Sequence, residues 1–283
     1  MKNFIIRTIT GVFFVAAIVV SFPNPIAIVF LFALVTGLTI WEFCGLVNER
    51  PYVQINQFIS TVAGVYLFLA MAGHCSGWVT SDTVFIPYLI TIIYLLVAEL
   101  YLKGKDPINN WAYTMLSQLY IALPFSTINV LAFPQAGHYS FILPLSVFLF
   151  LWTNDTGAYC VGSLLGKHKL FPRISPGKSW EGSIGGGLLV IGVAVLIWYL
   201  LSQTQQHTQQ HSDLGVLQWA GLGLTVVIFG TWGDLVESLF KRTLGIKDSG
   251  NILPGHGGML DRFDSALLAI PAAVIYLFTV SLL

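Results

Sequence analysis

Long apolar runs constrain the fold of this chain more than any other feature of its sequence. Hydrophobic residues make up 55% of its 283 positions, charged residues make up only 9%, and the mean hydropathy is +0.78. A helix needs about 20 apolar residues to cross about 30 Å of hydrocarbon, and several runs reach that length. The sequence therefore predicts an all-α, polytopic integral membrane protein.

We expect about nine membrane-spanning helices. The first apolar run could belong to a signal peptide, but Arg7 lies inside it and no small-residue cleavage site follows. Pro23 and Pro25 then lead directly into another apolar run, so we interpret the first run as a retained helix. The predicted segments lie near residues 5–21, 24–43, 57–73, 85–102, 112–132, 140–165, 183–201, 216–240 and 262–282.

The Lys and Arg residues fall on one side of this arrangement. With the N-terminus inside, all 13 of them lie on or next to the inner side. The opposite loops carry Asp82, Asp213 and otherwise uncharged polar residues. The positive-inside rule therefore predicts a cytoplasmic N-terminus and an outward-facing C-terminus at Leu283.

Cysteine usage indicates neither a disulfide framework nor a zinc site. Cys44, Cys75 and Cys160 are too few for a framework, and the predicted topology puts Cys44 and Cys75 on opposite sides. The sequence holds no CxxC motif. The chemistry of the chain must therefore come from its charged residues.

The segment 238–264 concentrates charge in an otherwise oily chain, with four basic residues and three carboxylates. Asp261 and Asp264 are three apart and fall on one helical face, while Asp234 lies about two helical turns before Lys241. Converging carboxylates with Lys and Arg nearby suit Mg²⁺ holding a polyphosphate, because Mg²⁺ is bound through one or two carboxylates plus substrate phosphates. The alternative is a solvated loop between two spans.

A second polar segment, residues 166–187, offers basic side chains to phosphate groups. Its GKS tripeptide at 177–179 resembles the end of a Walker A motif, but Pro172 stands where a glycine is required and we expect no strand before it. We therefore reject a P-loop. The alternative is a basic inner loop attracted to anionic lipid. The basic residues are Lys167, Lys169, Arg173 and Lys178.

A third polar motif, Asn154 and Asp155, ends an apolar run and precedes Thr-Gly. Such a pair either caps a broken helix or contributes to a polar cavity in the membrane protein. We favour the cavity.

Together these motifs resemble the phosphatidate cytidylyltransferase family, also called CDP-diacylglycerol synthases. The family signature reads Ser, two residues, Lys-Arg, four residues, Lys-Asp, then Pro-x-His-Gly-Gly-x-x-Asp-Arg-x-Asp. The chain meets it without departure in type or spacing, and the resemblance extends upstream through NDTGAY, SPGKSWEG and GDLVES. The matching residues are Ser238, Lys241, Arg242, Lys247, Asp248, Pro254, His256, Gly257, Gly258, Asp261, Arg262 and Asp264.

The resemblance implies that CTP and phosphatidate react to give CDP-diacylglycerol and pyrophosphate for phospholipid biosynthesis. It implies catalytic roles for Lys241, Arg242, Asp261 and Asp264, and Mg²⁺ held by Asp234, Asp261 and Asp264, with a monovalent cation such as K⁺ as a further candidate. The implied substrate-binding residues are Lys167, Lys178, Ser238, Lys247, His256, Gly257, Gly258 and Arg262.

The same resemblance implies a homodimer in the inner membrane, with the site facing the cytoplasm and no nucleic-acid partner. We expect residues 1–139 to form a packing and dimer scaffold and residues 140–283 to form the catalytic half. A prenol kinase or an archaeal-lipid CDP transferase is an alternative, because such an enzyme would need the same kind of site. A transporter is a weaker alternative, because the sequence shows neither inverted repeats nor midplane polar groups in both halves.

Overall fold

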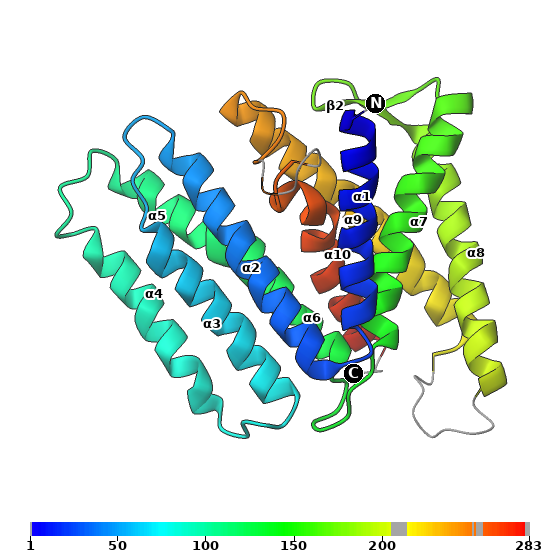
Figure 1. The fold of residues 1–283 in the computed structure, drawn as a ribbon, viewed down its shortest axis with the longest axis horizontal. Helices are drawn as coiled ribbons and strands as arrows, with labels where there is room; N and C mark the ends of the chain where they lie inside the picture. The colour runs from blue at the N-terminus through cyan, green and yellow to red at the C-terminus, as the bar shows by residue number, and fades with distance from the viewer. Residues whose placement is uncertain (1, 205–213, 251, 253–256, 281–283) are drawn as a thin grey trace. The chain divides into compact units, whose positions relative to one another are not determined.

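The structure is a computed structural model that describes residues 2–204, 214–250, 252 and 257–280. Helices dominate these residues (Figure 1), which confirms the predicted all-α membrane fold. The elements are α1 (Lys2–Ser21), α2 (Pro25–Asn48), α3 (Gln57–Cys75), η1 (Asp82–Phe85), α4 (Ile86–Ala98), α5 (Pro107–Leu116), η2 (Ser117–Ala122), α6 (Leu123–Ala132), α7 (Ile142–Leu165), β1 (Lys169–Phe171), β2 (Ser175–Ser179), α8 (Trp180–Thr204), α9 (Val216–Leu244) and α10 (Leu260–Thr279).

Within the described residues, six helical segments are long and apolar enough to cross a membrane. They are Pro25–Asn48, Gln57–Cys75, Pro107–Ala132, Trp180–Gln203, Val216–Leu244 and Leu260–Thr279. Thr10–Ser21 and Asp82–Ala98 are apolar but shorter, and α7 is less apolar because its second half carries Asn154 and Asp155. The protein is therefore a multi-pass helical membrane protein, while the count of nine spans stays a prediction.

The helical segment at residues 107–132 contains one wide turn, η2, which is π-helical. There the N–H of Leu123 donates to the carbonyl of Gln118, five residues earlier. Pro124 follows and has no N–H, so it cannot continue the α-helical hydrogen-bond ladder. The π turn thus lies where the sequence interrupts regular helix bonding.

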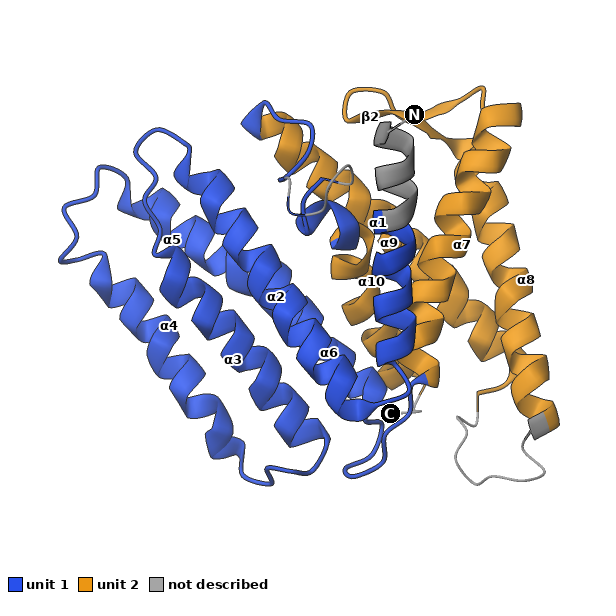
Figure 2. Ribbon diagram, viewed as in Figure 1, with its two compact units in different colours: residues 1–141, 244–263 blue, residues 142–243, 264–283 orange. Residues whose placement is uncertain are grey.

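Two compact units make up the chain (Figure 2). Unit 1 comprises residues 1–141 and 244–263, and unit 2 comprises residues 142–243 and 264–283. The helix α10 begins in unit 1 and continues in unit 2. The expected division into an N-terminal scaffold and a catalytic C-terminal half concerns function and stays a prediction.

An aromatic cluster anchors the first turn of α10 in the core of unit 1. The ring of Phe263 packs edge-on against Phe125 of α6, with centroids 5.3 Å apart, and against Phe32 of α2 at 6.1 Å. All three side chains are buried. Edge-to-face ring pairs stabilise the folded state more than the burial of their apolar area alone. The start of α10 is therefore held firmly in the core of unit 1.

Small residues bring α7 and α8 together in unit 2. A Cβ at Gly186 of α8 would lie 2.6 Å from Oδ1 of Asn154, and a Cβ at Gly157 of α7 would lie 3.0 Å from Cα of Gly186. Only glycine permits so close an approach, as is common between membrane helices.

A short antiparallel hairpin joins α7 to α8, with Lys169 of β1 opposite Ser179 of β2. The expectation of no strand before the GKS tripeptide is wrong, because β1 precedes it and the tripeptide itself lies in β2. Rejection of a P-loop still holds. Pro172 replaces the required glycine, and the tripeptide is extended where a P-loop would curl around phosphate.

Candidate active site

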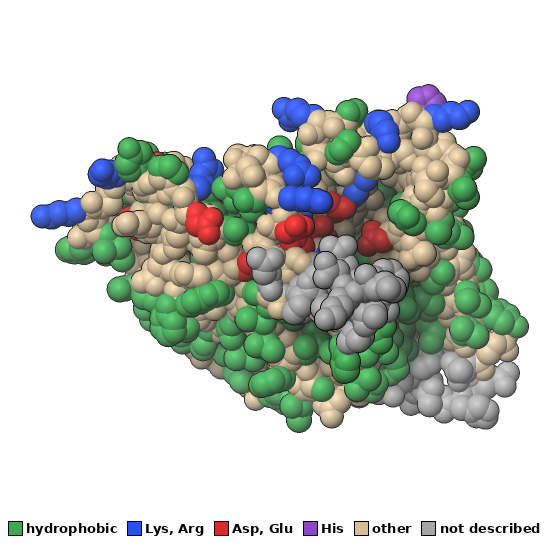
Figure 3. Space-filling view, turned by 45° about the horizontal axis from the view of Figure 1, so that its top comes forward, with side chains coloured by type: hydrophobic (Ala, Val, Ile, Leu, Met, Phe, Trp, Pro, Cys, Tyr) green, Lys and Arg blue, Asp and Glu red, His purple; other side chains and the backbone are tan. Residues whose placement is uncertain are grey.

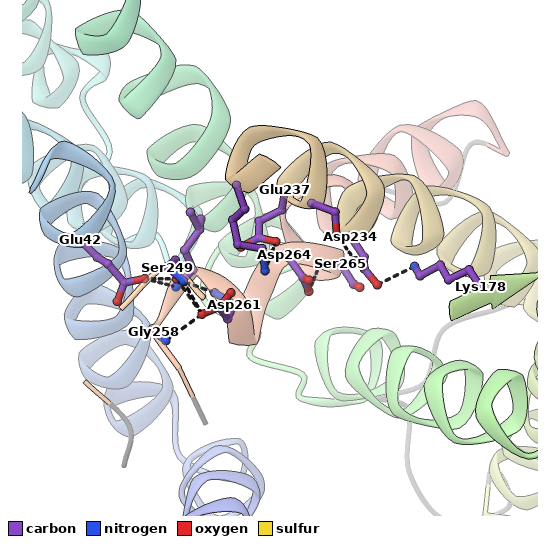
Figure 4. Close-up of polar contacts among 12 residues, drawn as sticks. Glu42, Lys178, Asp234, Glu237, Ser249, Gly258, Asp261, Asp264 and Ser265 are labelled. Atoms are coloured by element: carbon purple, nitrogen blue, oxygen red, sulfur yellow. Dashed lines mark hydrogen bonds and ion pairs between the residues drawn. The ribbon is translucent and has the colours of Figure 1, made fainter. Parts of the chain in front are cut away.

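Carboxylates gather where α9 and α10 approach each other in unit 2 (Figure 4). Asp264 of α10 interacts electrostatically with Asp234 of α9 and with Asp155 of α7. Gly233 permits this approach, because a Cβ there would lie 2.5 Å from the carbonyl oxygen of Asp264. Neighbouring carboxylates repel one another unless a cation lies between them. The region therefore favours bound positive charge.

A divalent cation fits this donor set only with help from a substrate. Among the described residues, no three His, Cys, Asp or Glu side chains are grouped closely enough to hold a metal ion by themselves. Mg²⁺ needs only one or two protein carboxylates when phosphates supply further oxygen ligands. Asp234 and Asp264 therefore fit Mg²⁺ that carries a polyphosphate.

Lys178 reaches the acidic region from β2. Its Nζ lies 2.5 Å from Oδ2 of Asp234, and both side chains are only partly exposed. Ser238, one helical turn after Asp234, donates from Oγ to Oδ1 of that carboxylate at 3.1 Å. Two predicted substrate-binding residues thus contact one predicted metal ligand.

Lys241 forms a buried ion pair on α9. Its Nζ lies 2.6 Å from Oε2 of Glu237, whose side chain is 0% exposed, while that of Lys241 is 13% exposed. The ammonium also interacts electrostatically with Asp264. The structure therefore places Lys241 beside the carboxylates of unit 2, as its spacing from Asp234 predicts.

A cavity of about 330 Å³ opens beside this region in unit 2. Asn154 and Asp155 line it together with Lys178 and Asp234. The helix α7 continues unbroken past this pair to Leu165. The preference for a polar cavity over a broken helix is therefore confirmed, and both charge signs lie on the cavity wall.

Asp261 accepts hydrogen bonds from other residues of unit 1. Its Oδ2 accepts hydrogen bonds from the backbone N–H of Ser249 at 2.8 Å and of Gly258 at 2.9 Å. Gly257 has a φ of 82°, and a Cβ there would lie 2.5 Å from the same oxygen. A side chain at that position would be strained and would collide with Asp261. The local fold thus explains the glycine, and the role of Asp261 as a metal ligand stays a prediction.

Glu42 is not among the predicted site residues, yet it contacts the same loop. This buried side chain of α2 accepts hydrogen bonds from the backbone N–H of Met259 at 2.7 Å and of Leu260 at 3.1 Å. It also accepts from Oγ of Ser249. The available signal was a carboxylate inside an apolar helix, which calls for a partner or a function.

Other predicted site residues, both catalytic and substrate-binding, are exposed. In Figure 3, Lys and Arg side chains lie near carboxylates on the visible face, and hydrophobic side chains cover much of the rest of that face. His256 and Pro254 of the signature lie outside the described residues. The exposed predicted residues are Lys167, Arg242, Lys247 and Arg262.

Known proteins resemble the chain over almost its whole length. The model of the Cytidylyltransferase family matches residues 2–280. A phosphatidate cytidylyltransferase of Staphylococcus aureus (strain COL) is 33% identical over 272 residues, which cover 94% of this chain and 96% of that protein. A phosphatidate cytidylyltransferase of Staphylococcus saprophyticus subsp. saprophyticus is 32% identical over 284 residues, covering 97% and 99%. With this match and the signature around α10, the chain belongs to the cytidylyltransferase family.

Proposed function

We propose that this protein transfers CMP from CTP to phosphatidate, giving CDP-diacylglycerol and pyrophosphate for phospholipid biosynthesis. The observation that carries the proposal is the grouping of Asp155, Asp234 and Asp264 with Lys178 and Lys241 in one unit of a cytidylyltransferase-family membrane protein. The relatives named phosphatidate cytidylyltransferase align over nearly the whole chain. Both substrates carry phosphates, which such a mixed cluster can bind.

The reaction needs one in-line displacement at phosphorus. A phosphate oxygen of phosphatidate forms a bond to the α-phosphorus of CTP, and the bond from that phosphorus to the bridging β-phosphate oxygen breaks. Pyrophosphate leaves with the electron pair. Positioning and stabilisation of charge carry most of such a transfer, so no covalent enzyme intermediate is needed.

Charged side chains supply that positioning in unit 2. Lys178 and Lys241 provide positive charge for the triphosphate, and Ser238 orients the carboxylate of Asp234. Arg242 of unit 2 and Arg262 of unit 1 are exposed. We propose that both add positive charge for phosphate binding, with Arg242 also a catalytic candidate from the family resemblance. The preorganised donors are therefore the two lysines, which already lie among the carboxylates.

We further infer a requirement for Mg²⁺ at Asp234 and Asp264 of unit 2, while Asp261 stays a ligand expected from the family resemblance alone. Bound Mg²⁺ would supply charge stabilisation for the triphosphate. A monovalent cation such as K⁺ stays a weaker expectation from the family resemblance. Asp261→Asn and Asp264→Asn should each nearly abolish turnover in folded protein, because an amide keeps the size and loses the charge that holds a hard cation. Near-normal activity would remove that residue from the ligand set.

The membrane arrangement is also part of the proposal. Nine spans with a cytoplasmic N-terminus place all 13 Lys and Arg residues on or next to the inner side. Phosphatidate keeps its acyl chains in the bilayer, while CTP is cytosolic, so a cytoplasm-facing site in the inner membrane lets them meet. A homodimer is proposed from the family resemblance alone.

The deciding experiment follows two labels of CTP into lipid. Purified protein in nanodiscs receives phosphatidate and CTP labelled at either the α- or the γ-phosphate, with and without Mg²⁺. We expect the α-label in the lipid and the γ-label in pyrophosphate. A γ-label in the lipid would indicate a kinase. Absence of the α-label from the lipid, or of the γ-label from pyrophosphate, would refute the assignment. Replacing phosphatidate with an ether-linked archaeal lipid tests the related CDP transferase.

A further inference from the structure

Glu42 is a carboxylate in the interior of unit 1. It lies on α2 between helical neighbours that pack into the core, and only 8% of its surface is exposed. Burial of a carboxylate is costly unless hydrogen bonds or a cation compensate it. The ion pairs of the described residues do not include Glu42. Its compensation therefore comes from hydrogen-bond donors.

Those donors come from the start of α10, more than 200 residues along the chain. The first N–H groups of a helix have no partner inside the helix. Glu42 accepts from two of these N–H groups, those of Met259 at 2.7 Å and Leu260 at 3.1 Å. A carboxylate at this end also interacts favourably with the helix dipole. Glu42 thus caps α10 from a different helix.

Ser249 links Glu42 to Asp261. Its Oγ lies within hydrogen-bond distance of Oε1 of Glu42 and 3.0 Å from Oδ2 of Asp261. A hydroxyl has one proton to donate, so the two carboxylates share the hydroxyl of Ser249. The N–H of Ser249 donates to Asp261 at 2.8 Å throughout. The orientation of Asp261 therefore depends on where Glu42 holds the serine.

Two glycines leave room for the Glu42 carboxylate. A Cβ at Gly258 would lie 2.0 Å from Oε1, and a Cβ at Gly250 would lie 2.8 Å from Oε2. The two glycines flank the segment between Ser249 and α10. The backbone at Gly250 and at Gly258 thus comes close to this carboxylate. Figure 4 shows the Glu42 side chain together with Ser249 and Asp261.

We propose that Glu42 is a positioning residue for the reaction. It holds Ser249 and the N–H groups of Met259 and Leu260 beside α2, and it thereby fixes the side chain of Asp261 and the backbone at Gly258. It acts through Ser249 and the backbone and makes no contact with substrate. Its effect on turnover rests on the proposed function, whereas its effect on the start of α10 does not.

The test compares Glu42→Ala, Glu42→Gln and the control Glu99→Gln. Glu99 is another carboxylate of unit 1. It accepts a hydrogen bond from Nδ2 of Asn110 at 3.0 Å, and Asn110 belongs to α5 and not to α10. We expect kcat to fall about 30- to 100-fold in Glu42→Ala, since a displacement of about 1 Å at a site can cost that much. The KM for CTP should change less than about threefold. Glu42→Gln keeps one acceptor and the side-chain volume, so it should retain about tenfold more activity than Glu42→Ala.

A second measurement separates positioning from turnover. Amide hydrogen exchange at Met259 and Leu260 should be at least about tenfold faster in Glu42→Ala than in wild type, and unchanged in Glu99→Gln. Faster exchange in a protein that makes no CDP-diacylglycerol would support the capping role while refuting the proposed function. Unchanged exchange, or unchanged kcat in active protein, would overturn the inference.

A double variant tests the route through Ser249. Because Ser249→Ala breaks the same link, Glu42→Ala and Ser249→Ala together should lower kcat much less than the product of their separate effects. Multiplicative effects would overturn the link. If Glu42→Ala does not fold, the same cycle with Glu42→Gln gives the answer.

Discussion

Replacing Lys241 separates two effects of its ammonium group in unit 2. Nζ lies 2.6 Å from Oε2 of Glu237, and the two side chains are 13% and 0% exposed. The same ammonium interacts electrostatically with Asp264. Lys241→Ala should therefore leave a buried carboxylate without this cation and also remove positive charge from the proposed triphosphate site.

The loss of the buried ion pair lowers stability, whereas the loss of positive charge lowers turnover, and a second substitution can separate the two. Breaking a buried ion pair by removing one partner costs about 3–5 kcal/mol of stability. Losing one preorganised group that faces developing charge costs about 2–4 kcal/mol of transition-state stabilisation. Lys241→Ala should show both losses. Lys241→Ala combined with Glu237→Gln removes the uncompensated charge, so it should recover stability while turnover stays low.

The assay pairs thermal unfolding in detergent with kcat/KM for CTP, corrected for the folded fraction. Lys105→Ala is the matched control, because that ammonium is exposed and lies 5.1 Å from the ring centroid of Tyr52. We expect the control to change activity less than about threefold. Wild-type turnover in the double variant would refute a catalytic role for Lys241. Wild-type stability in Lys241→Ala would refute the importance of the buried pair.

Three further outcomes are expected. Lys178→Ala removes the cation 2.5 Å from Asp234. The resulting fall in kcat/KM for CTP should correspond to a loss of about 2–4 kcal/mol of transition-state stabilisation. An effect as small as that of Lys105→Ala would remove Lys178 from the proposed site. In the residual activity of Asp264→Asn, the Mg²⁺ concentration needed for half-maximal turnover should rise, and an unchanged Mg²⁺ titration would contradict its ligand role. In a Cys160→Ser background, cysteines at Thr80 and Lys247 should react with an impermeant reagent from opposite faces, and labelling from one face would refute the predicted topology.

Helix positions could be predicted because bilayer thickness sets the length of an apolar run. Each predicted span overlaps a helix of the structure in the described residues. The hairpin at 169–179 escaped prediction because its strands are short, polar and mostly exposed, which leaves no alternating apolar pattern. The π turn before Pro124 was missed because proline in an apolar run permits several local solutions.

The site residues likewise differ in how far their contacts could be predicted from the sequence. Lys241 could be placed beside Asp234 because helical spacing on α9 fixes their common face. The link from Glu42 to Ser249 could not be predicted, because no local period relates residues more than 200 positions apart. Nor does spacing reveal that Lys178 pairs with Asp234, since that contact depends on how the hairpin folds back. Contacts inside one helix thus follow from its period, whereas the contacts of Glu42 with Ser249 and of Lys178 with Asp234 required the folded structure.

The distribution of polar groups also weighs against a transporter. In unit 1, buried amides serve the helix backbone: Nε2 of Gln118 donates to the carbonyl of Ser60 at 2.9 Å, and Nδ2 of Asn129 donates to that of Ser126 at 3.1 Å. The buried carboxylate of Glu42 in unit 1 likewise accepts from backbone N–H groups and from Ser249, whereas in unit 2 charged side chains of both signs line a cavity. A transporter built from repeats should carry comparable polar sites in corresponding positions of its two halves. An enzyme needs only one cluster where a nucleotide and a lipid head group can meet, so the cytidylyltransferase proposal accounts for the asymmetry.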